Sequence, residues 1–258
     1  MTTSRPPVLV EAAVESVAGA IVAEHAGAQR IELCANLTEG GTTPSAGTIG
    51  AAVARVKAPV FVMIRPRGGD FLYTSVELDV MTRDIATARS LGAHGIVLGV
   101  LTRDGIVDVD RTRALVEAAR PLPVTFHRAF DLTIDLGEAL ESVIACGVAR
   151  VLTSGGAPRA ADGIERLAAL VRRGGARITV MPGGGISATN AVTIIQKSGS
   201  REIHVGGTIP VASEMRFRRP EVSFARPPMP DEYTLTIADE GRLRGVIEAV
   251  SASPTPRR

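Results

Sequence analysis

Carboxylate and imidazole side chains lie at the ends of several short apolar runs in this sequence. The residues that could act as general acids or bases are Glu11, Glu32, His127 and Asp131. Burying an ionised group without a partner is costly, so such groups must neutralise one another or a ligand if they converge. We therefore predict a charged ligand site, with a purely structural ion-pair network as the alternative.

A second group of residues offers hydrogen-bond donors suited to an anion. Arg65 and Arg67 flank a proline that fixes an extended path, and guanidinium groups bind carboxylates and phosphates well. The Gly68–Gly69 pair that follows permits a sharp turn. The other expected ligand-binding side chains are Asp70, Arg128, Thr153, Ser154 and His204.

Two glycine-rich turns could form a cradle for an anion. The run PGGGI (182–186) contains Gly184 and Gly185, and we expect a helix to begin directly after it, with its positive end exposed. Gly206 and Gly207 would supply the second half of the cradle. The alternative is that these glycines only permit tight turns.

These residues are placed by Val/Ile-rich runs that alternate with longer Ala-rich amphipathic stretches. We predict strands at 8–13, 30–34, 59–65, 95–100, 123–129, 150–154, 178–182 and 202–206. We predict helices at 15–26, 46–56, 75–91, 108–119, 135–145, 160–173 and 187–198. This alternation indicates parallel βαβ units.

The number of strands and the chain length of 258 residues favour an α/β fold, a single (β/α)8 TIM barrel with an extended C-terminal segment. The barrel would cover about 8–210 of a single domain spanning 1–258. An extended loop (209–234) and a last helix near 236–250 would fill about 211–250, before a frayed tail at 251–258. An open doubly wound sheet is the alternative, but the first turn, EAAVES, lacks glycine.

The composition limits the remaining function classes. With 3% aromatic residues and no Trp, we expect a core of layered Val, Ile, Leu and Ala. A net charge of +2 argues against a nucleic-acid or membrane-surface partner. The N-terminal MTTSRPP lacks an apolar stretch, and two cysteines are too few for a disulfide framework, so we expect a cytoplasmic protein.

Several longer motifs resemble the CutC copper-homeostasis family. They are RIELCANLTEGGTTPS (30–45), IRPRGGDF (64–71), TFHRAFD (125–131) and RVLTSG (150–155), with the GGGI and EIHV segments. The resemblance covers most of 8–219 and implies a cytoplasmic TIM barrel, often a homo-oligomer, with a role in copper homeostasis or copper ion binding. The family's residues at the barrel mouth correspond to Glu11, Glu32, Arg65, Arg67, Asp70, His127, Arg128, Asp131 and His204.

The resemblance also implies copper as the bound metal, through one cysteine after each of the first two strands. Cys34 matches the second of these, whereas Ala12 and Ala13 stand where the first is expected. Cu(I) prefers thiolate and thioether ligands, so the sequence supports copper only weakly. Cys34 is the candidate metal ligand, and a buried apolar role is its alternative.

The residues themselves suit an enzyme better, although no reaction can be named from them. We expect a metal-independent or divalent-metal-assisted isomerase, lyase or hydrolase acting on a small anionic ligand, including a phosphorylated metabolite. Lys57 and Lys197 do not lie at strand ends, so a Schiff-base mechanism is not expected. A non-catalytic sensor that uses the same mouth is a third alternative.

Overall fold

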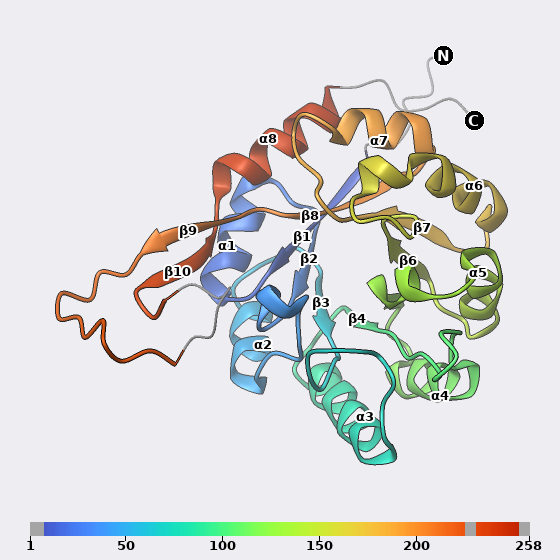
Figure 1. Cartoon of the computed structure of the whole chain (residues 1–258), viewed down its shortest axis with the longest axis horizontal. Helices are drawn as coiled ribbons and strands as arrows, with labels where there is room; N and C mark the ends of the chain where they lie inside the picture. Colours follow the sequence, from blue (N-terminus) through green and yellow to red (C-terminus); the bar gives the residue numbers. More distant parts are fainter. Residues whose placement is uncertain (1–7, 225–230, 253–258) are drawn as a thin grey trace.

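A ring of parallel strands surrounded by helices forms the body of the molecule (Figure 1). The structure is a computed structural model, which describes residues 8–224 and 231–252. The strands of the ring are β1 (Leu9–Val14), β2 (Arg30–Leu33), β3 (Val60–Met63), β4 (Gly95–Leu98), β5 (Val124–Phe126), β6 (Arg150–Thr153), β7 (Thr179–Pro182) and β8 (Glu202–Gly206). The predicted TIM barrel is confirmed.

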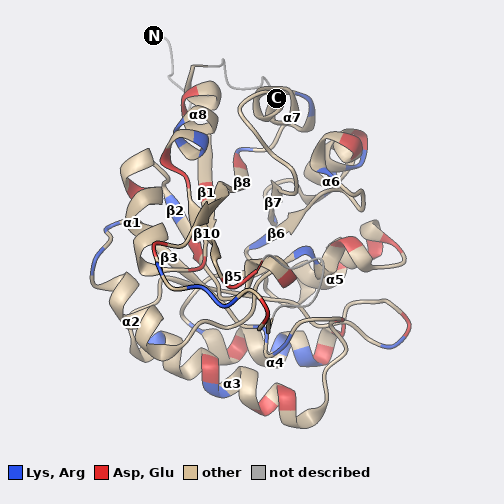
Figure 2. Ribbon diagram, turned by 60° about the vertical axis from the view of Figure 1, so that its left-hand side comes forward, with Lys and Arg blue, Asp and Glu red and all other residues tan. Residues whose placement is uncertain are grey.

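The helices alternate with the strands along the chain. They are α1 (Val17–Ala26), α2 (Ala46–Val53), α3 (Ser75–Ser90), α4 (Val109–Ala119), α5 (Leu136–Ala145), α6 (Ile164–Gly174), α7 (Ala191–Ser198) and α8 (Glu240–Ser251). Short 3-10 turns are η1 (Leu37–Glu39), η2 (Arg128–Leu132) and η3 (Ala160–Gly163). Basic and acidic residues both occur along α3, α4 and α6 (Figure 2).

Side-chain caps define where several helices begin. Thr74 and Glu77 form a reciprocal capping box at the start of α3, and the Asp108 carboxylate accepts a hydrogen bond from the first turn of α4. No helix among the described residues is long and apolar enough to cross a membrane.

Hydrogen bonding joins the strands in the order β7-β6-β5-β4-β3-β2-β1-β8. The strands β7 and β8 lie next to each other, but within the described chain no backbone ladder joins them. The Ser200 hydroxyl bridges this seam by donating to the carbonyl of Val180 at 2.6 Å. The barrel is therefore closed at this one place by side chains.

The interior of the barrel is more polar than the expected layered aliphatic core. Val, Ile, Leu and Ala side chains fill the space between the strands and the helices. Inside the ring, Arg30 of β2 pairs with Glu11 of β1 and Glu202 of β8, and Arg150 of β6 also pairs with Glu202. Since β2, β6 and β8 are not neighbours in the sheet, these contacts must cross the interior. The expected core of Val, Ile, Leu and Ala is present, but it lies between the strands and the helices, because strand alternation sends these side chains outward. The ring itself also encloses the ion pairs.

The C-terminal segment also differs from its prediction. Instead of one extended loop, Thr208–Ala212 (β9) and Thr234–Ala238 (β10) pair as antiparallel strands. They project from the barrel beside α1 and α8 (Figure 1). The last helix begins at Glu240, because the Asp239 side chain caps it and the Ile-containing run before it pairs with β9. Of the expected frayed tail, residues 253–258 lie outside the described residues.

Candidate functional site

A cavity of about 420 Å³ opens at the carboxyl ends of the strands. Its walls bring together many of the residues that the sequence indicated as site residues. Those lining it are Glu32, Arg65, His127, Arg128, Gly184, Gly185, His204 and Gly206. Apolar groups, among them Met63, Phe71 and Leu152, complete its surface.

Two buried carboxylates and one imidazole form a cluster at this mouth, in which Glu32 and His204 line the cavity and Glu11 does not. Nδ1 of His204 lies 2.8 Å from Oε1 of Glu11, and Nε2 lies 3.9 Å from Oε2 of Glu32. Burial opposes the charged form of Glu11, but the His204 hydrogen bond and the Arg30 charge lower its pKa to about 2. Burial raises the pKa of Glu32, with a further contribution from the Glu11 charge. The two carboxylates therefore differ in proton affinity, as an acid–base site requires.

Three further charged residues form ion pairs beside this cluster, and the sequence patterns did not indicate them as site residues. They are Arg30, Arg150 and Glu202. Both guanidinium groups lie over the Phe61 ring, at 5.0 and 5.3 Å from its centroid. Phe61 finds room because Gly95 on the next strand has no side chain, and a Cβ there would lie 2.4 Å from the ring. Arg30 pairs with the Glu11 carboxylate, Glu202 pairs with both arginines, and none of the three residues lines the cavity.

Arg65 is a buried cation at the cavity wall. Its side chain is 4% exposed, and its Nη atoms donate to the carbonyls of Glu39, Gly41 and Gly69 at 2.7–2.8 Å. No carboxylate of the described chain forms an ion pair with it. Carbonyl oxygens orient a guanidinium but do not cancel its charge, so the mouth keeps a positive charge that an anion can neutralise.

His127 presents a hydrogen-bond donor at the same wall. Its Nδ1 accepts a hydrogen bond from the backbone N–H of Ala129 at 3.2 Å, and burial together with the Arg65 charge lowers its pKa to about 3. The neutral ring therefore carries its proton on Nε2, which is buried without a partner among the described residues. Gly99 makes room for the ring, since a Cβ there would lie 2.5 Å from Cε1.

Asp131, Thr153 and Ser154 form a separate hydrogen-bonded group beside the mouth. Asp131 accepts hydrogen bonds from the Thr153 hydroxyl and from the backbone N–H groups of Ser154 and Gly156, and it pairs with Arg128 at 2.8 Å. None of these three lines the cavity. The geometry suits them to positioning Arg128, which does line it.

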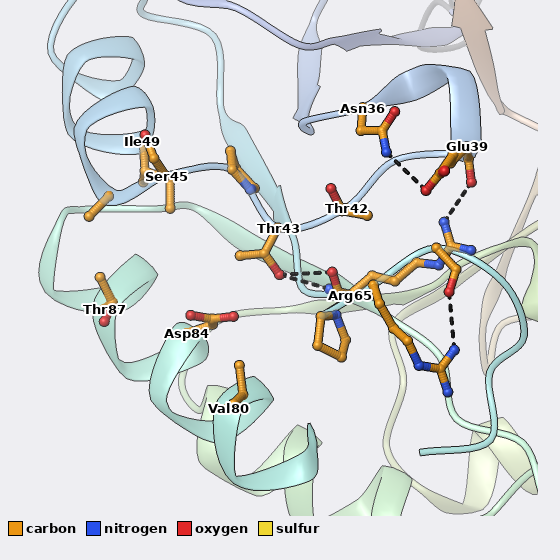
Figure 3. Close-up of a pocket in the computed structure, with 15 residues that line it drawn as sticks. Asn36, Glu39, Thr42, Thr43, Ser45, Ile49, Arg65, Val80, Asp84 and Thr87 are labelled. Carbon is orange, nitrogen blue, oxygen red and sulfur yellow. Dashed lines mark hydrogen bonds between the residues drawn. The ribbon is translucent and has the colours of Figure 1, made fainter. Parts of the chain in front are cut away.

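Arg67 and Asp70 lie away from the central cavity. The Arg67 guanidinium pairs with Asp70 and with Glu77 at the start of α3, and Asp70 is 70% exposed. Arg67 instead lines a second pocket of about 620 Å³ between α2 and α3 (Figure 3). Arg65 and Glu39 line both pockets, and Asp84 of α3 faces Thr43 across the outer one.

The glycine turns form only part of the expected cradle. Gly184 and Gly185 adopt positive φ values of 100° and 68°, and the Arg128 guanidinium lies against Gly184. However, α7 begins at Ala191 and not directly after the turn, because residues 188–190 form a separate turn. Gly207 packs against Leu243 of α8, where a Cβ would lie 2.5 Å from that side chain, and it does not line the cavity.

Cys34 does not fit a Cu(I) thiolate site. Its side chain is fully buried beside Phe61, Met63 and Val97, and the Sγ–H donates to Glu32 at 3.5 Å. Burial and the Glu32 charge raise the pKa of the thiol well above its usual range, whereas Cu(I) binding requires the thiolate. Ala13 lines the mouth in place of a second thiol, and Cys146 lies on the outer side of the barrel at the end of α5.

The fold and this mouth define a (β/α)8 barrel with a cavity lined by charged residues at the carboxyl ends of its strands. The model of the CutC family matches residues 8–209, and the chain belongs to this family. A CutC family protein of Mesorhizobium japonicum is 45% identical over 98% of this chain and 98% of its own. The human copper homeostasis protein cutC homolog is 46% identical over 92% of this chain and 86% of its own.

Solved structures agree with this assignment. A putative copper homeostasis protein CutC from Streptococcus agalactiae superposes with a TM-score of 0.74 at 37% identity, covering 77% of this chain and 98% of its own. An N-(5'-phosphoribosyl)anthranilate isomerase from Pyrococcus furiosus gives a TM-score of 0.56 at 13% identity, over 94% of this chain and 98% of its own. This second likeness shows the fold alone.

Proposed function

We propose that the mouth cavity binds a small organic anion and transfers a proton on it. The observation that carries this proposal is Arg65, a cation that is 4% exposed and pairs with no carboxylate in the described parts of the chain. A buried charge of this kind is stabilised by an anionic ligand. Arg128 and the Gly184–Gly185 turn line the same cavity, and the Arg128 guanidinium adds a second cation there.

The chemistry that suits these groups is proton abstraction next to a carbonyl. Burial raises the pKa of Glu32, which makes it a better base near neutral pH than an exposed carboxylate. The Nε2–H of His127 and the Arg65 guanidinium line the same cavity and would stabilise the oxyanion that develops on the substrate. An isomerase or lyase of a small carboxylate or phosphorylated metabolite uses this set of groups.

A role in copper homeostasis is the second candidate, and the printed names of the human and mouse relatives favour it. From these names we carry over copper homeostasis as a proposal. A cytoplasmic location and homo-oligomeric assembly are proposed from the resemblance of the sequence motifs alone. The protonated Cys34 thiol does not supply a Cu(I) site by itself. On this second proposal, copper would bind to the protein through ligand atoms other than a pair of thiolates.

Binding of defined anions separates these proposals. Isothermal titration with inorganic phosphate, pyruvate and dihydroxyacetone phosphate should reveal saturable binding of at least one probe to the wild-type protein. Arg65→Gln should weaken that binding about 10- to 100-fold, the usual cost of a lost charge-assisted hydrogen bond. Arg83→Gln, a change at an exposed arginine of α3, is the control and should bind as the wild type does.

Proton transfer is tested by deuterium incorporation into the bound probe in D2O. The wild-type protein should exchange the proton next to the carbonyl, and Glu32→Gln should not. Equal binding by the wild-type and Arg65→Gln proteins, or no binding across the three probes, would overturn the anion proposal. Stoichiometric binding of Cu(I) with no anion binding would favour the second candidate instead.

A further inference from the structure

Glu11, Glu32 and His204 bring three possible metal-binding atoms within 4.8 Å of one another. They come from β1, β2 and β8, which are adjacent strands of the barrel. We propose that a divalent metal ion binds between the Glu32 carboxylate and Nε2 of His204, with Glu11 orienting the imidazole. This inference does not rest on the proposed proton transfer.

The imidazole of His204 is held in the orientation that metal binding requires. Its Nδ1 lies 2.8 Å from Oε1 of Glu11, so a proton on Nδ1 is donated to that carboxylate. In the neutral ring the lone pair is then on Nε2, which lies on the Glu32 side of the ring. A carboxylate that fixes a histidine in this way is a recurrent support of metal sites in proteins.

The separation between the two proposed ligand atoms is suitable. Nε2 of His204 and Oε2 of Glu32 are 3.9 Å apart, which is too long for a hydrogen bond. Two ligands of one tetrahedral zinc-like ion each bond at about 2.0–2.2 Å, so the two ligand atoms are separated by about 3.4 Å. Only a small movement of either side chain is needed to admit an ion.

An independent observation also points to a ligand here. Glu32 is only 3% exposed and lines the cavity. Its Oε1 atom is buried and has no hydrogen-bond partner among the described residues. A buried carboxylate oxygen without a donor is unfavourable unless a cation or a ligand completes it. Glu11 has no such vacancy, because Arg30 and His204 engage both of its oxygens.

The donor atoms determine the class of ion. One imidazole nitrogen and carboxylate oxygen suit divalent ions such as Zn²⁺, Co²⁺ and Mn²⁺, whereas Cu(I) prefers sulfur. The same donors bind Cu²⁺ more tightly than Zn²⁺ in the general order of metal affinities. The two residues supply only part of a coordination shell, so the remaining positions would open to the cavity for water or an anion.

Titration of the metal-free protein with Co²⁺ and Zn²⁺ tests the proposal. We expect one Co²⁺ per chain, with visible absorption bands that Zn²⁺ displaces. His204→Gln and Glu32→Gln should each abolish the bands, and Glu11→Gln should weaken binding about 10- to 100-fold, as expected for an orienting partner. The matched control is His25→Gln, at an exposed histidine in the last turn of α1, which should bind as the wild type does.

Circular dichroism and urea unfolding of the variants show whether each remains folded. If His204→Gln does not fold, Glu32→Gln still tests the site, because the amide keeps the shape of the carboxylate. Failure of the wild-type chain to bind either ion, or retention of the Co²⁺ bands in folded Glu32→Gln, would overturn the proposal. Anion binding is measured without metal, so its result stays separate from this one.

Discussion

The buried imidazole of His127 should make the protein sensitive to mild acid. Its pKa is lowered to about 3 in the folded protein by burial and by the Arg65 charge, against an ordinary value of 6.5. Between these two values the unfolded chain binds a proton at this residue and the folded chain does not, so stability falls as the pH decreases below 6.5. Replacing His127 by a side chain that does not titrate should remove this part of the pH dependence.

The size of the effect follows from the two pKa values. At pH 5 the difference in proton binding costs the folded wild-type protein about 2 kcal/mol, and at pH 7 it costs only about 0.2 kcal/mol. His127→Asn is the suitable change, because its side-chain oxygen can accept the Ala129 N–H in place of Nδ1. Even where the variant has a lower free energy of unfolding than the wild type at pH 7, the difference between the two proteins should change by about 2 kcal/mol in favour of the variant between pH 7 and pH 5.

The assay is urea unfolding of both proteins at the two pH values, followed by far-ultraviolet circular dichroism. His25→Asn serves as the control, since this histidine is exposed in the last turn of α1. All other titrating groups are common to the proteins, so the comparison isolates the single imidazole. If the wild type and His127→Asn lose stability in parallel between pH 7 and pH 5, the imidazole is charged or hydrated in the folded state and the reasoning is refuted.

Three further predictions concern the interior. Arg30→Met removes the cation that Glu11 and Glu202 share, which leaves Glu11 with His204 and Glu202 with Arg150, and it should lower the free energy of unfolding by about 3–5 kcal/mol. Arg177→Met, at an exposed ion pair, should change it far less in the same urea titration. Gly99→Ala should cost about 1–3 kcal/mol, because the new methyl group overlaps the imidazole beside it, and a calorimetric melting temperature equal to that of the wild type would contradict this. A thiol reagent should label Cys34 and Cys146 only after unfolding, so rapid labelling of either in the native protein would show that its side chain reaches solvent.

The sequence was sufficient to predict the barrel and much of the mouth. Alternation of apolar runs and amphipathic stretches defines the strands, and the ends of parallel strands meet at one edge. Glu32, Arg65, His127 and His204 therefore converge as expected. The position of Arg67 was not predictable in this way, because its guanidinium turns outward to Glu77, a contact that depends on where α3 begins.

The charged interior could have been found by a stricter use of strand alternation. Arg30 precedes Glu32 by two residues on one strand, so the two side chains share a face. If Glu32 points into the barrel, Arg30 must point there too. A buried guanidinium group then needs carboxylate partners, and Glu202 is one of them. The identity of those partners depends on the barrel register, which pairs Glu11 with Arg30 and with His204 on either side.

The seam between β7 and β8 gives the barrel a preferred place to open locally. Every other neighbouring pair of strands in the described barrel is joined by backbone hydrogen bonds, which must break together, whereas this pair depends on side-chain contacts such as that of Ser200. Protection from amide hydrogen exchange should therefore be lowest along this edge. Gly183 follows β7 close to His204 of β8, where a Cβ would lie 3.3 Å from the Cβ of His204, so a local opening there would widen the mouth without unfolding the rest of the ring.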